Sequence, residues 1–243
     1  MAYKRTAIEW EPGAENVVIL APHMDDETIG CGGTLAKHWA QGATVQVVFL
    51  TDGRRGSSAL AAYRGEARRQ KENELMLMRK GEAQRALHML GVHDHVFLDA
   101  EDGALRSSTS VAPALREVLE RRRPDIVYVP FFLEQHPDHW AATAVLLDAV
   151  EGTRLNFQCM LYEVWTPLFP NCLVRIDDTV ELKKRALAHY ASQLADADYL
   201  HSALGLAAYR ASGFAAHYAT YAEAFCSLPL DDYRALFKAC SSS

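Results

Sequence analysis

Short apolar runs alternate with longer helical patterns along much of the chain, and each run is long enough for one buried strand. The clearest are residues 17–21 (VVILA), 45–50 (VQVVFL) and 125–130 (DIVYVP). Strands that are covered on both faces read as nearly continuous apolar segments, and strand–helix–strand units with short links form parallel sheets. The pattern therefore predicts an α/β fold: a Rossmann-like, doubly wound, mostly parallel sheet with helices on both faces.

The remaining segments carry weaker patterns. We expect further strands at 96–98 and 161–165, helices at 71–90, 112–120, 141–150 and 179–194, and a loop or short helix at 53–69. No clear strand is expected after residue 195. Because no repeat or linker divides the chain, we expect a single domain over 1–243. Its motif-bearing core would span about 16–194, with 195–243 as a C-terminal elaboration.

Composition excludes several classes of protein. Lys and Arg number 25 against 31 Asp and Glu, a formal charge of −6, so a basic nucleic-acid-binding surface is not expected. Five cysteines without a C-x-x-C pair favour a reducing compartment over a disulfide framework. No apolar signal core or membrane-length run is visible. We therefore expect a cytoplasmic protein with no membrane span, and the sequence leaves a homo-oligomer open.

Two clusters of histidine and aspartate each follow a predicted strand. The first contains His23, Asp25 and Asp26, and the second contains His136, Asp138 and His139. Ligands of open α/β sheets bind at the carboxyl ends of strands, so the clusters face one crevice if their strands are neighbours. Taken singly, each cluster also fits a helix N-cap with a nearby histidine. Together, they supply the imidazoles and carboxylates of a catalytic zinc site, with groups left over for acid–base chemistry.

Several short motifs follow one another along the chain. They are Ala21–Glu27 (APHMDDE), Gly30–Thr34 (GCGGT), Thr51–Gly53 (TDG) and His136–His139 (HPDH), with a helix pattern from Arg79 to Gly91 and a block from Lys183 to Gln193. The chain thereby resembles the LmbE-like, or PIG-L, family of zinc-dependent N-deacetylases. The similarity is strong over about 16–145 and looser to about 194. Met24 and Glu134 depart from it, because many members have proline at the first position and some have tyrosine at the second.

The resemblance implies roles for these residues and a reaction. It makes His23, Asp26 and His139 the metal ligands, Asp25 the general base, protonated His136 the oxyanion-stabilising group, Asp138 the residue that holds His136, and Arg79 a substrate contact. The implied cofactor is Zn²⁺, with another divalent metal such as Fe²⁺ as an option. The implied activity is removal of an N-acetyl or other N-acyl group from a small N-acetylglucosamine-type sugar conjugate.

Two other functions compete with this interpretation. A nucleotide-binding Rossmann oxidoreductase would use the glycines after the first strand, but Leu35 breaks the G-x-G-x-x-G spacing and the preceding acidic residues would repel a pyrophosphate. A non-catalytic sugar-binding module would use aromatic residues such as Trp165, although aromatics at such spacing usually belong to a core. Outside the two clusters, His93 and His95 form the one histidine pair with any case for a metal.

Overall fold

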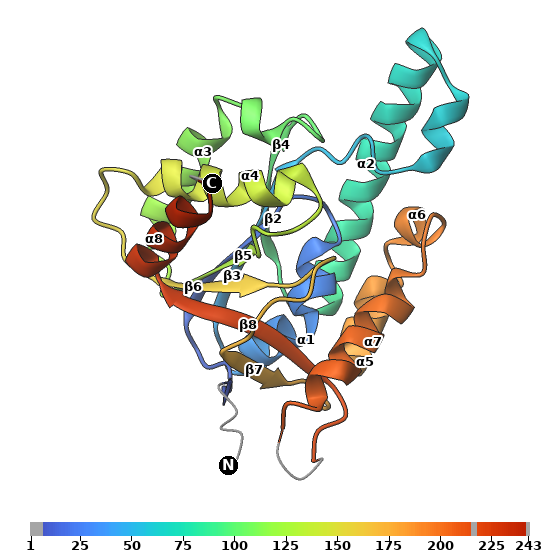
Figure 1. The fold of residues 1–243 in the computed structure, drawn as a ribbon. Helices are drawn as coiled ribbons and strands as arrows, with labels where there is room; N and C mark the ends of the chain where they lie inside the picture. The colour runs from blue at the N-terminus through green and yellow to red at the C-terminus, as the bar shows by residue number, and fades with distance from the viewer. Residues whose placement is uncertain (1–6, 215–217, 242–243) are drawn as a thin grey trace.

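The computed structural model describes residues 7–214 and 218–241, whose strands form one mixed, eight-stranded sheet (Figure 1). The strands are β1 (Ile8–Glu9), β2 (Asn16–Ala21), β3 (Thr44–Thr51), β4 (Asp94–Ala100), β5 (Ile126–Pro130), β6 (Gln158–Tyr162), β7 (Cys172–Arg175) and β8 (Ala222–Pro229). Their order across the sheet is β1-β7-β8-β6-β5-β2-β3-β4. All neighbouring pairs are parallel except those that β8 makes with β6 and β7.

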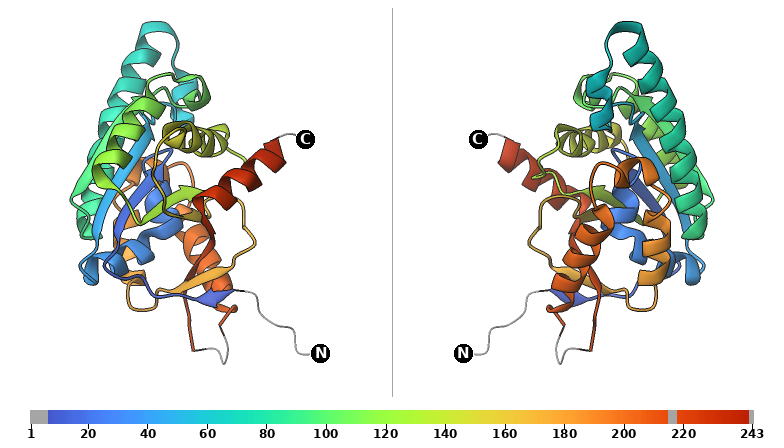
Figure 2. Two further views of the ribbon diagram at one scale, coloured as in Figure 1. Left: turned by 90° about the vertical axis from the view of Figure 1, so that its left-hand side faces the viewer. Right: turned by 90° about the vertical axis from the view of Figure 1, so that its right-hand side faces the viewer.

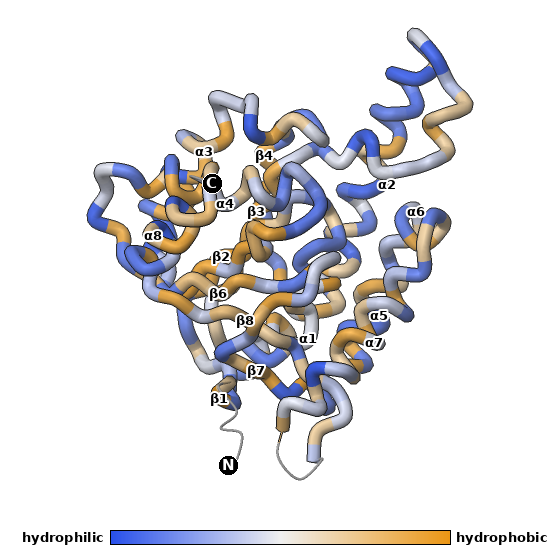
Figure 3. The backbone as a smooth tube through the Cα atoms, in the orientation of Figure 1, coloured by the Kyte–Doolittle hydropathy of each residue, from blue (hydrophilic) through white to orange (hydrophobic). Residues whose placement is uncertain are grey.

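Helices cover both faces of this sheet (Figure 2). One face carries α1 (Asp26–Ala40), α2 (Gly65–Met89), α5 (Val180–Leu187) and α7 (Tyr199–Ala211), and the other carries α3 (Val111–Arg122), α4 (Pro137–Val150) and α8 (Leu230–Ser241). Alternate residues of β2 serve the two cores, since Val17 and Ile19 face the first and Val18 and Leu20 the second. The apolar strands lie at the centre of Figure 3, whereas the outer end of α2 is hydrophilic. The predicted doubly wound fold is therefore confirmed.

The topology brings the two polar clusters together. β2 pairs in parallel with β3 on one side and with β5 on the other, so Val17 is opposite both Val45 and Ile126. The chain reverses its direction of winding between β2 and β5, which creates the switch point where such sheets bind ligands. The strands that precede the two clusters are thus neighbours, as a shared crevice requires.

Several predicted elements in the C-terminal half were wrong. The expectation of no strand after 195 fails because β8 lies between β6 and β7. Its Glu223 is buried and paired with Lys183 (2.6 Å), and a charged residue inside a strand hides the apolar pattern. The helix expected at 179–194 is divided at Tyr190, which has non-helical backbone angles, into α5 and α6 (Ala191–Leu194).

Two loop boundaries also differ from the prediction. The strand expected at 161–165 lies at Gln158–Tyr162, because the amides of residues 164–166 donate to the Glu134 side chain instead of to a neighbouring strand. The segment 53–69 contains a 3₁₀ helix, η1 (Ser58–Ala62), and the start of α2. A second 3₁₀ helix, η2 (Leu105–Ser107), follows β4.

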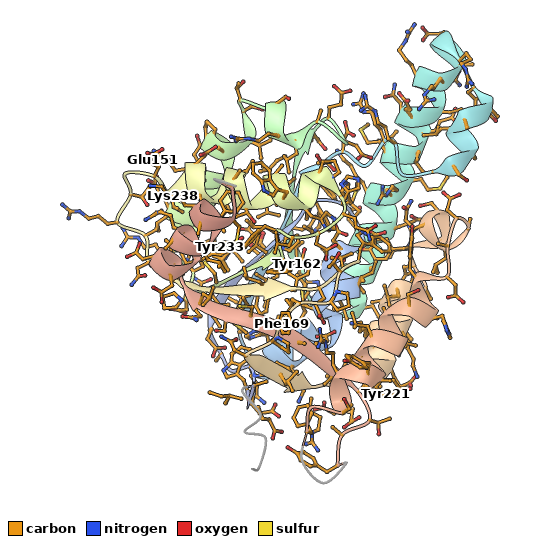
Figure 4. All side chains as sticks on the ribbon, viewed as in Figure 1. Glu151, Tyr162, Phe169, Tyr221, Tyr233 and Lys238 are labelled. Carbon is orange, nitrogen blue, oxygen red and sulfur yellow. The ribbon has the colours of Figure 1, made fainter. Side chains whose placement is uncertain are left out.

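The glycines after the first cluster allow α1 to approach the sheet closely. A Cβ atom at Gly30 would lie 2.8 Å from the carbonyl oxygen of Glu163 and would also overlap Tyr162, which is labelled in Figure 4. The amides of Gly33 and Thr34 donate to the carboxylate of Glu223, at 2.9 and 2.8 Å. These amides are therefore occupied by the protein itself. A Rossmann pyrophosphate would need such donors free, so the oxidoreductase alternative loses its support.

Candidate active site

A cavity of about 300 Å³ opens at the carboxyl ends of β2, β3 and β5. Of the residues selected from the sequence, His23, Asp25, Asp26, Arg79 and His136 line it directly. The remaining two, Asp138 and His139, are buried and contact the lining residues from the start of α4. The structure thus brings all seven selected residues into one site.

The backbone at Asp25 separates two adjacent carboxylates. Asp25 has φ 130°, an unusual value for a residue other than glycine, and its carbonyl accepts the first amides of α1 from Thr28 and Ile29. This turn directs Asp26 towards His23 and His139. It directs Asp25 towards Arg79, whose Nη2 lies 3.5 Å from Asp25 Oδ1. Neighbouring residues in the sequence therefore face different partners.

The geometry around Asp26 suits a divalent metal. Its Oδ2 atom lies 3.2 Å from Nδ1 of His23 and 3.2 Å from Nε2 of His139. The ligand atoms of a tetrahedral zinc site, each about 2.0–2.2 Å from the metal, are about 3.3–3.5 Å apart. His139 is fully buried, yet neither of its ring nitrogens makes a hydrogen bond within the described part of the chain. A buried imidazole in this state is suited to bind a cation.

His23 is held from its other side by two carboxylates. Its Nε2 atom lies 3.3 Å from Asp102 Oδ1 and 3.2 Å from Asp138 Oδ2. A histidine that binds metal through one nitrogen commonly donates the other N–H to a carboxylate, which fixes its tautomer and orientation. Burial would raise the pKa of Asp102, but the hydrogen bond to His23, the charge of that ring, the Arg55 amide and the charge of Arg79 together outweigh burial and hold the pKa at about 2.

Sequence reasoning missed Asp102. It follows the end of β4 by two residues, at the same edge of the sheet as the two clusters. That position is the one signal that could have found it, because no recognised motif surrounds it. Arg55, Gln193 and Tyr199 also line the cavity and were missed as site residues. They reach the cavity from a loop, a short helix and the start of α7, which no local pattern connects.

One hydrogen bond and burial both bear on the protonation of His136. The amide of Asp138 donates to His136 Nδ1 (3.2 Å), so this nitrogen carries no proton and Nε2 is the donor of a neutral ring. Burial lowers the pKa of His136, and the charge of neighbouring His23 adds to the effect. The neutral form of the ring is therefore favoured, and the protonated His136 that would hold the oxyanion stays a prediction. A neutral ring in this tautomer can still donate one hydrogen bond.

Asp138 supports the site through both its main chain and its side chain. The carboxylate accepts from the amides of Gly103 (2.7 Å) and Leu105 (3.1 Å) as well as contacting His23. The Asp138 amide also contacts His136, at Nδ1, which agrees with the expectation that Asp138 holds His136. One residue thus positions both histidines and ties η2 to α4.

Arg79 lies beneath the cavity and is 2% exposed. Its Nη1 donates to the carbonyl of Gly53 (3.0 Å) and its Nη2 to that of Met24 (2.8 Å). Burial raises the pKa of the Asp25 carboxyl to about 8, while the charge of Arg79 opposes that rise. The guanidinium therefore holds the turn that presents Asp25 and favours its ionised form.

Other combinations of these side chains could also share an ion. Among the described residues, nitrogen atoms of His23, His136 and His139 lie within 4.8 Å of one another, as do ligand atoms of His23, Asp102, His136 and Asp138. Both groups belong to this cavity, and His93 and His95 belong to neither. The carboxylate of Asp138 is already bound by two amides, and that of Asp102 by the amide of Arg55. Asp26 belongs to neither group, and its Oδ2 atom also accepts the His23 amide (2.9 Å), so the ligand set His23, Asp26 and His139 stays a prediction.

Several known proteins resemble this chain over much of its length. The family model described as PIG-L: GlcNAc-PI de-N-acetylase matches residues 18–150. A diacetylchitobiose deacetylase from Thermococcus kodakarensis is 32% identical over 195 residues, which cover 74% of this chain and 70% of that protein. A 1D-myo-inositol 2-acetamido-2-deoxy-alpha-D-glucopyranoside deacetylase from Mycobacteroides abscessus is 31% identical over 154 residues, 56% of this chain and 55% of the relative. This second alignment thus spans about half of the relative.

A solved structure extends the likeness to the whole fold. The N,N′-diacetylchitobiose deacetylase from Pyrococcus horikoshii, complexed with its inhibitor MPG, superposes with a TM-score of 0.71 and 28% identity. The superposition covers 88% of this chain and 83% of that one. Separately, none of the helices in the described residues has both the length and the hydropathy that a bilayer span requires.

Proposed function

The chain belongs to the PIG-L family, and we propose that it hydrolyses the N-acetyl or N-acyl group of a small N-acetylglucosamine-type sugar conjugate. The observation that carries this proposal is that two adjacent carboxylates face different partners. Asp26 faces two imidazoles at 3.2 Å, and Asp25 faces the open cavity beside Arg79. A hydrolase needs this pairing of a cation site with a free base.

His23, Asp26 and His139 would hold the metal, for which Zn²⁺ is the best candidate. Two imidazoles and one carboxylate form a known catalytic zinc set, while Fe²⁺ also accepts two histidines and a carboxylate. When bound, the ion supplies positive charge that polarises an amide carbonyl and makes water more acidic. Asp102, Asp138 and Glu134 then act as the outer carboxylates that orient the two histidines.

Asp25 acts as the general base. It takes a proton from the attacking water, and its raised pKa lets it return that proton to the departing amine. Its place at the start of α1 and the Arg79 contact keep the carboxylate in one orientation. His136 donates from Nε2 to the oxygen of the tetrahedral intermediate. A preorganised donor of this kind contributes about 2.7–4 kcal/mol to lowering the barrier.

The part of the cavity that is lined by Arg55 and Asp102 suits a sugar. Arg55 and Asp102 line it together, joined by the Arg55 amide donating to Asp102 Oδ2 (3.0 Å) and by Arg55 Nη1 donating to the Asp102 carbonyl (2.9 Å). Gln193 lies nearby and donates to the carbonyl of Gly56 (3.0 Å). Fixed donors and acceptors of both charges recognise hydroxyl groups, so we assign the hydroxyl-bearing ring to this side.

The remaining features support a single domain in a reducing compartment. β8 comes from the proposed elaboration at 195–243 and pairs with β6 and β7 of the core, which supports a single folding unit. All five cysteines are unpaired thiols, which suits the cytoplasmic location that we propose.

The decisive experiment measures acetate and free amine released from N-acetylglucosamine and N,N′-diacetylchitobiose by zinc-loaded protein. We expect release that scales with zinc content and disappears in the Asp25→Asn variant. A parallel series with Fe²⁺ identifies the more active metal. If the fully loaded protein released no acetate from any N-acetylated sugar, the proposed function would be wrong.

A further inference from the structure

The order of the strands places polar and aromatic residues at opposite ends of the cavity. The proposed metal residues follow β2 and β5 in the middle of the sheet. The polar residues Arg55 and Asp102 follow β3 and β4 on one side. On the other side, Trp165 follows β6 and forms an edge-to-face pair with Tyr199 of α7, with ring centroids 5.0 Å apart at 62°. One end of the cavity is therefore polar and charged, and the other is aromatic.

A second cavity lies behind the aromatic end. It measures about 290 Å³ and shares Trp165 and Tyr199 with the first. Apart from these two rings and Ser202, its lining is wholly apolar: Ile29, Val164, Pro167, Ala203 and Leu206. We name this second cavity the apolar subsite. Since the same two rings bound both cavities, the apolar subsite adjoins the active site at Trp165 and Tyr199.

The aromatic boundary is anchored to the metal site. The Trp165 amide donates to Glu134 Oε2 (3.0 Å), and the same carboxylate lies 3.7 Å from Nδ1 of His139. Trp165 is nevertheless 41% exposed. A large aromatic side chain that is fixed by its main chain but open on its face is suited to contact a ligand rather than to fill a core.

We propose that the apolar subsite binds the alkyl part of an N-acyl group longer than acetyl. The inference rests on the proposed function, because it takes the scissile amide to lie beside the metal residues. A trans amide sends its nitrogen and carbon substituents in opposite directions. With the sugar on the polar side of the metal residues, the acyl chain points to the aromatic side. The volume is about twice that of a 150 Å³ cavity that holds benzene, so a chain of several carbons fits.

The test compares two series of methyl and alkyl glycosides. In the first, the acyl group of methyl glucosaminide is acetyl, butyryl, hexanoyl or octanoyl. In the second, the acyl group stays acetyl and the glycoside is methyl, butyl, hexyl or octyl. We expect kcat/KM to rise roughly two- to fourfold per added methylene up to hexanoyl in the first series and to stay flat in the second. A rise in kcat/KM in the second series alone would show that the apolar subsite binds the alkyl group of the glycoside, and it would overturn the proposal.

A blocking variant ties the preference to the subsite. Ser202 is exposed on α7 and lines the apolar subsite, so Ser202→Trp fills it without opening the core. We expect the hexanoyl-to-acetyl ratio of kcat/KM to fall at least tenfold in this variant. Ala208→Trp is the matched control, because Ala208 is exposed on the same helix and lines neither cavity. A chain-length preference that survives Ser202→Trp would overturn the proposal.

A binding measurement separates this inference from the proposed function. Calorimetry with the Asp25→Asn variant gives Kd for the acyl series without turnover. Tighter binding of longer acyl chains with no hydrolysis by the zinc-loaded native protein would support the subsite and refute the hydrolase. Hydrolysis of the acetyl compound with no gain in rate or Kd for longer chains would refute the subsite alone.

Discussion

The carboxylate of Glu134 lies 3.7 Å from Nδ1 of His139 and accepts hydrogen bonds from the amides of Val164, Trp165 and Thr166. The Glu134 side chain is fully buried. Three consecutive amides around an anion form a nest that stabilises its charge. One carboxylate therefore faces the second nitrogen of a proposed metal ligand and anchors the loop that carries Trp165.

Glu134→Gln is expected to weaken zinc binding by about 10- to 100-fold, because the residue behind a ligating histidine sets its orientation and basicity. The glutamine oxygen can still accept from the loop amides, so the fold should persist. Zinc affinity is measured by competition with a chelating dye. Glu120→Gln, the same change at an exposed position of α3, serves as the control. Equal affinity in both variants would show that Glu134 acts on the loop alone.

Asp25→Asn is expected to retain zinc while losing about 10²- to 10⁴-fold in kcat, because the amide cannot accept the proton of water. Asparagine tolerates the positive φ at this position better than alanine does. His23→Ala is the opposite case and should lose the metal. Zinc content by mass spectrometry and turnover are compared in the same preparations. Near-normal turnover in Asp25→Asn would remove the assignment of the base.

His136→Gln distinguishes a donor from a ligand. If His136 donates to the oxyanion, replacing it should lower kcat about 10²- to 10³-fold and leave the zinc content unchanged. As a metal ligand, which its closeness to His23 and His139 also permits, its replacement should reduce zinc content in parallel with activity. Zinc content in the purified variant therefore decides between the two roles.

Lys183→Met tests a buried ion pair that joins α5 to α1 and β8. Lys183 is 1% exposed, and its ammonium donates to Glu223 Oε1 (2.6 Å) and to the carbonyl of Ile29 (2.7 Å). Removing one partner leaves a buried charge, so we expect a loss of about 3–5 kcal/mol in unfolding free energy. The double variant Lys183→Met with Glu223→Gln should lose less than the sum of the single changes. Urea unfolding measures both, and additive losses would contradict a coupled pair.

His38 should make stability depend on pH below neutrality. It is fully buried, with Nδ1 donating to the carbonyl of Gly13 (3.0 Å) and Nε2 accepting from the hydroxyl of Tyr128 (2.9 Å). Burial lowers the pKa of His38 in the folded state. The unfolded state therefore binds the proton first, so the contribution is complete above about pH 6.5 and is lost as pH falls towards the folded pKa.

The slope attributable to His38 reaches at most about 1.4 kcal/mol per pH unit. We expect unfolding free energies measured between pH 7.5 and 5 to fall less steeply in His38→Gln than in the native chain. The comparison uses slopes, since the substitution also changes packing at every pH. An equally steep decline in the variant would assign the acid sensitivity to other groups.

Gly30 and Arg79 illustrate what can be predicted from a local sequence pattern and what cannot. The segment after the first strand shows small residues, but only the packed structure tells that Gly30 admits the carbonyl of Glu163 and that Glu223 occupies the amides of Gly33 and Thr34. In the same way, the helix carrying Arg79 was predicted, whereas its contact with Asp25 depends on how α2 packs on the sheet face that α1 also covers. Such contacts join residues far apart in the chain.

The sequence by itself determined the parallel core and the positions of the two polar clusters after β2 and β5, because buried strands and the polar residues that follow them can be recognised from short, local stretches of sequence. Only the tertiary structure decided that β8 enters between β6 and β7, that Asp102 backs His23, and that Trp165 and Tyr199 separate two cavities. These relationships arise from strand order and loop paths. They depend on the packing energy of the whole molecule, which no local pattern contains.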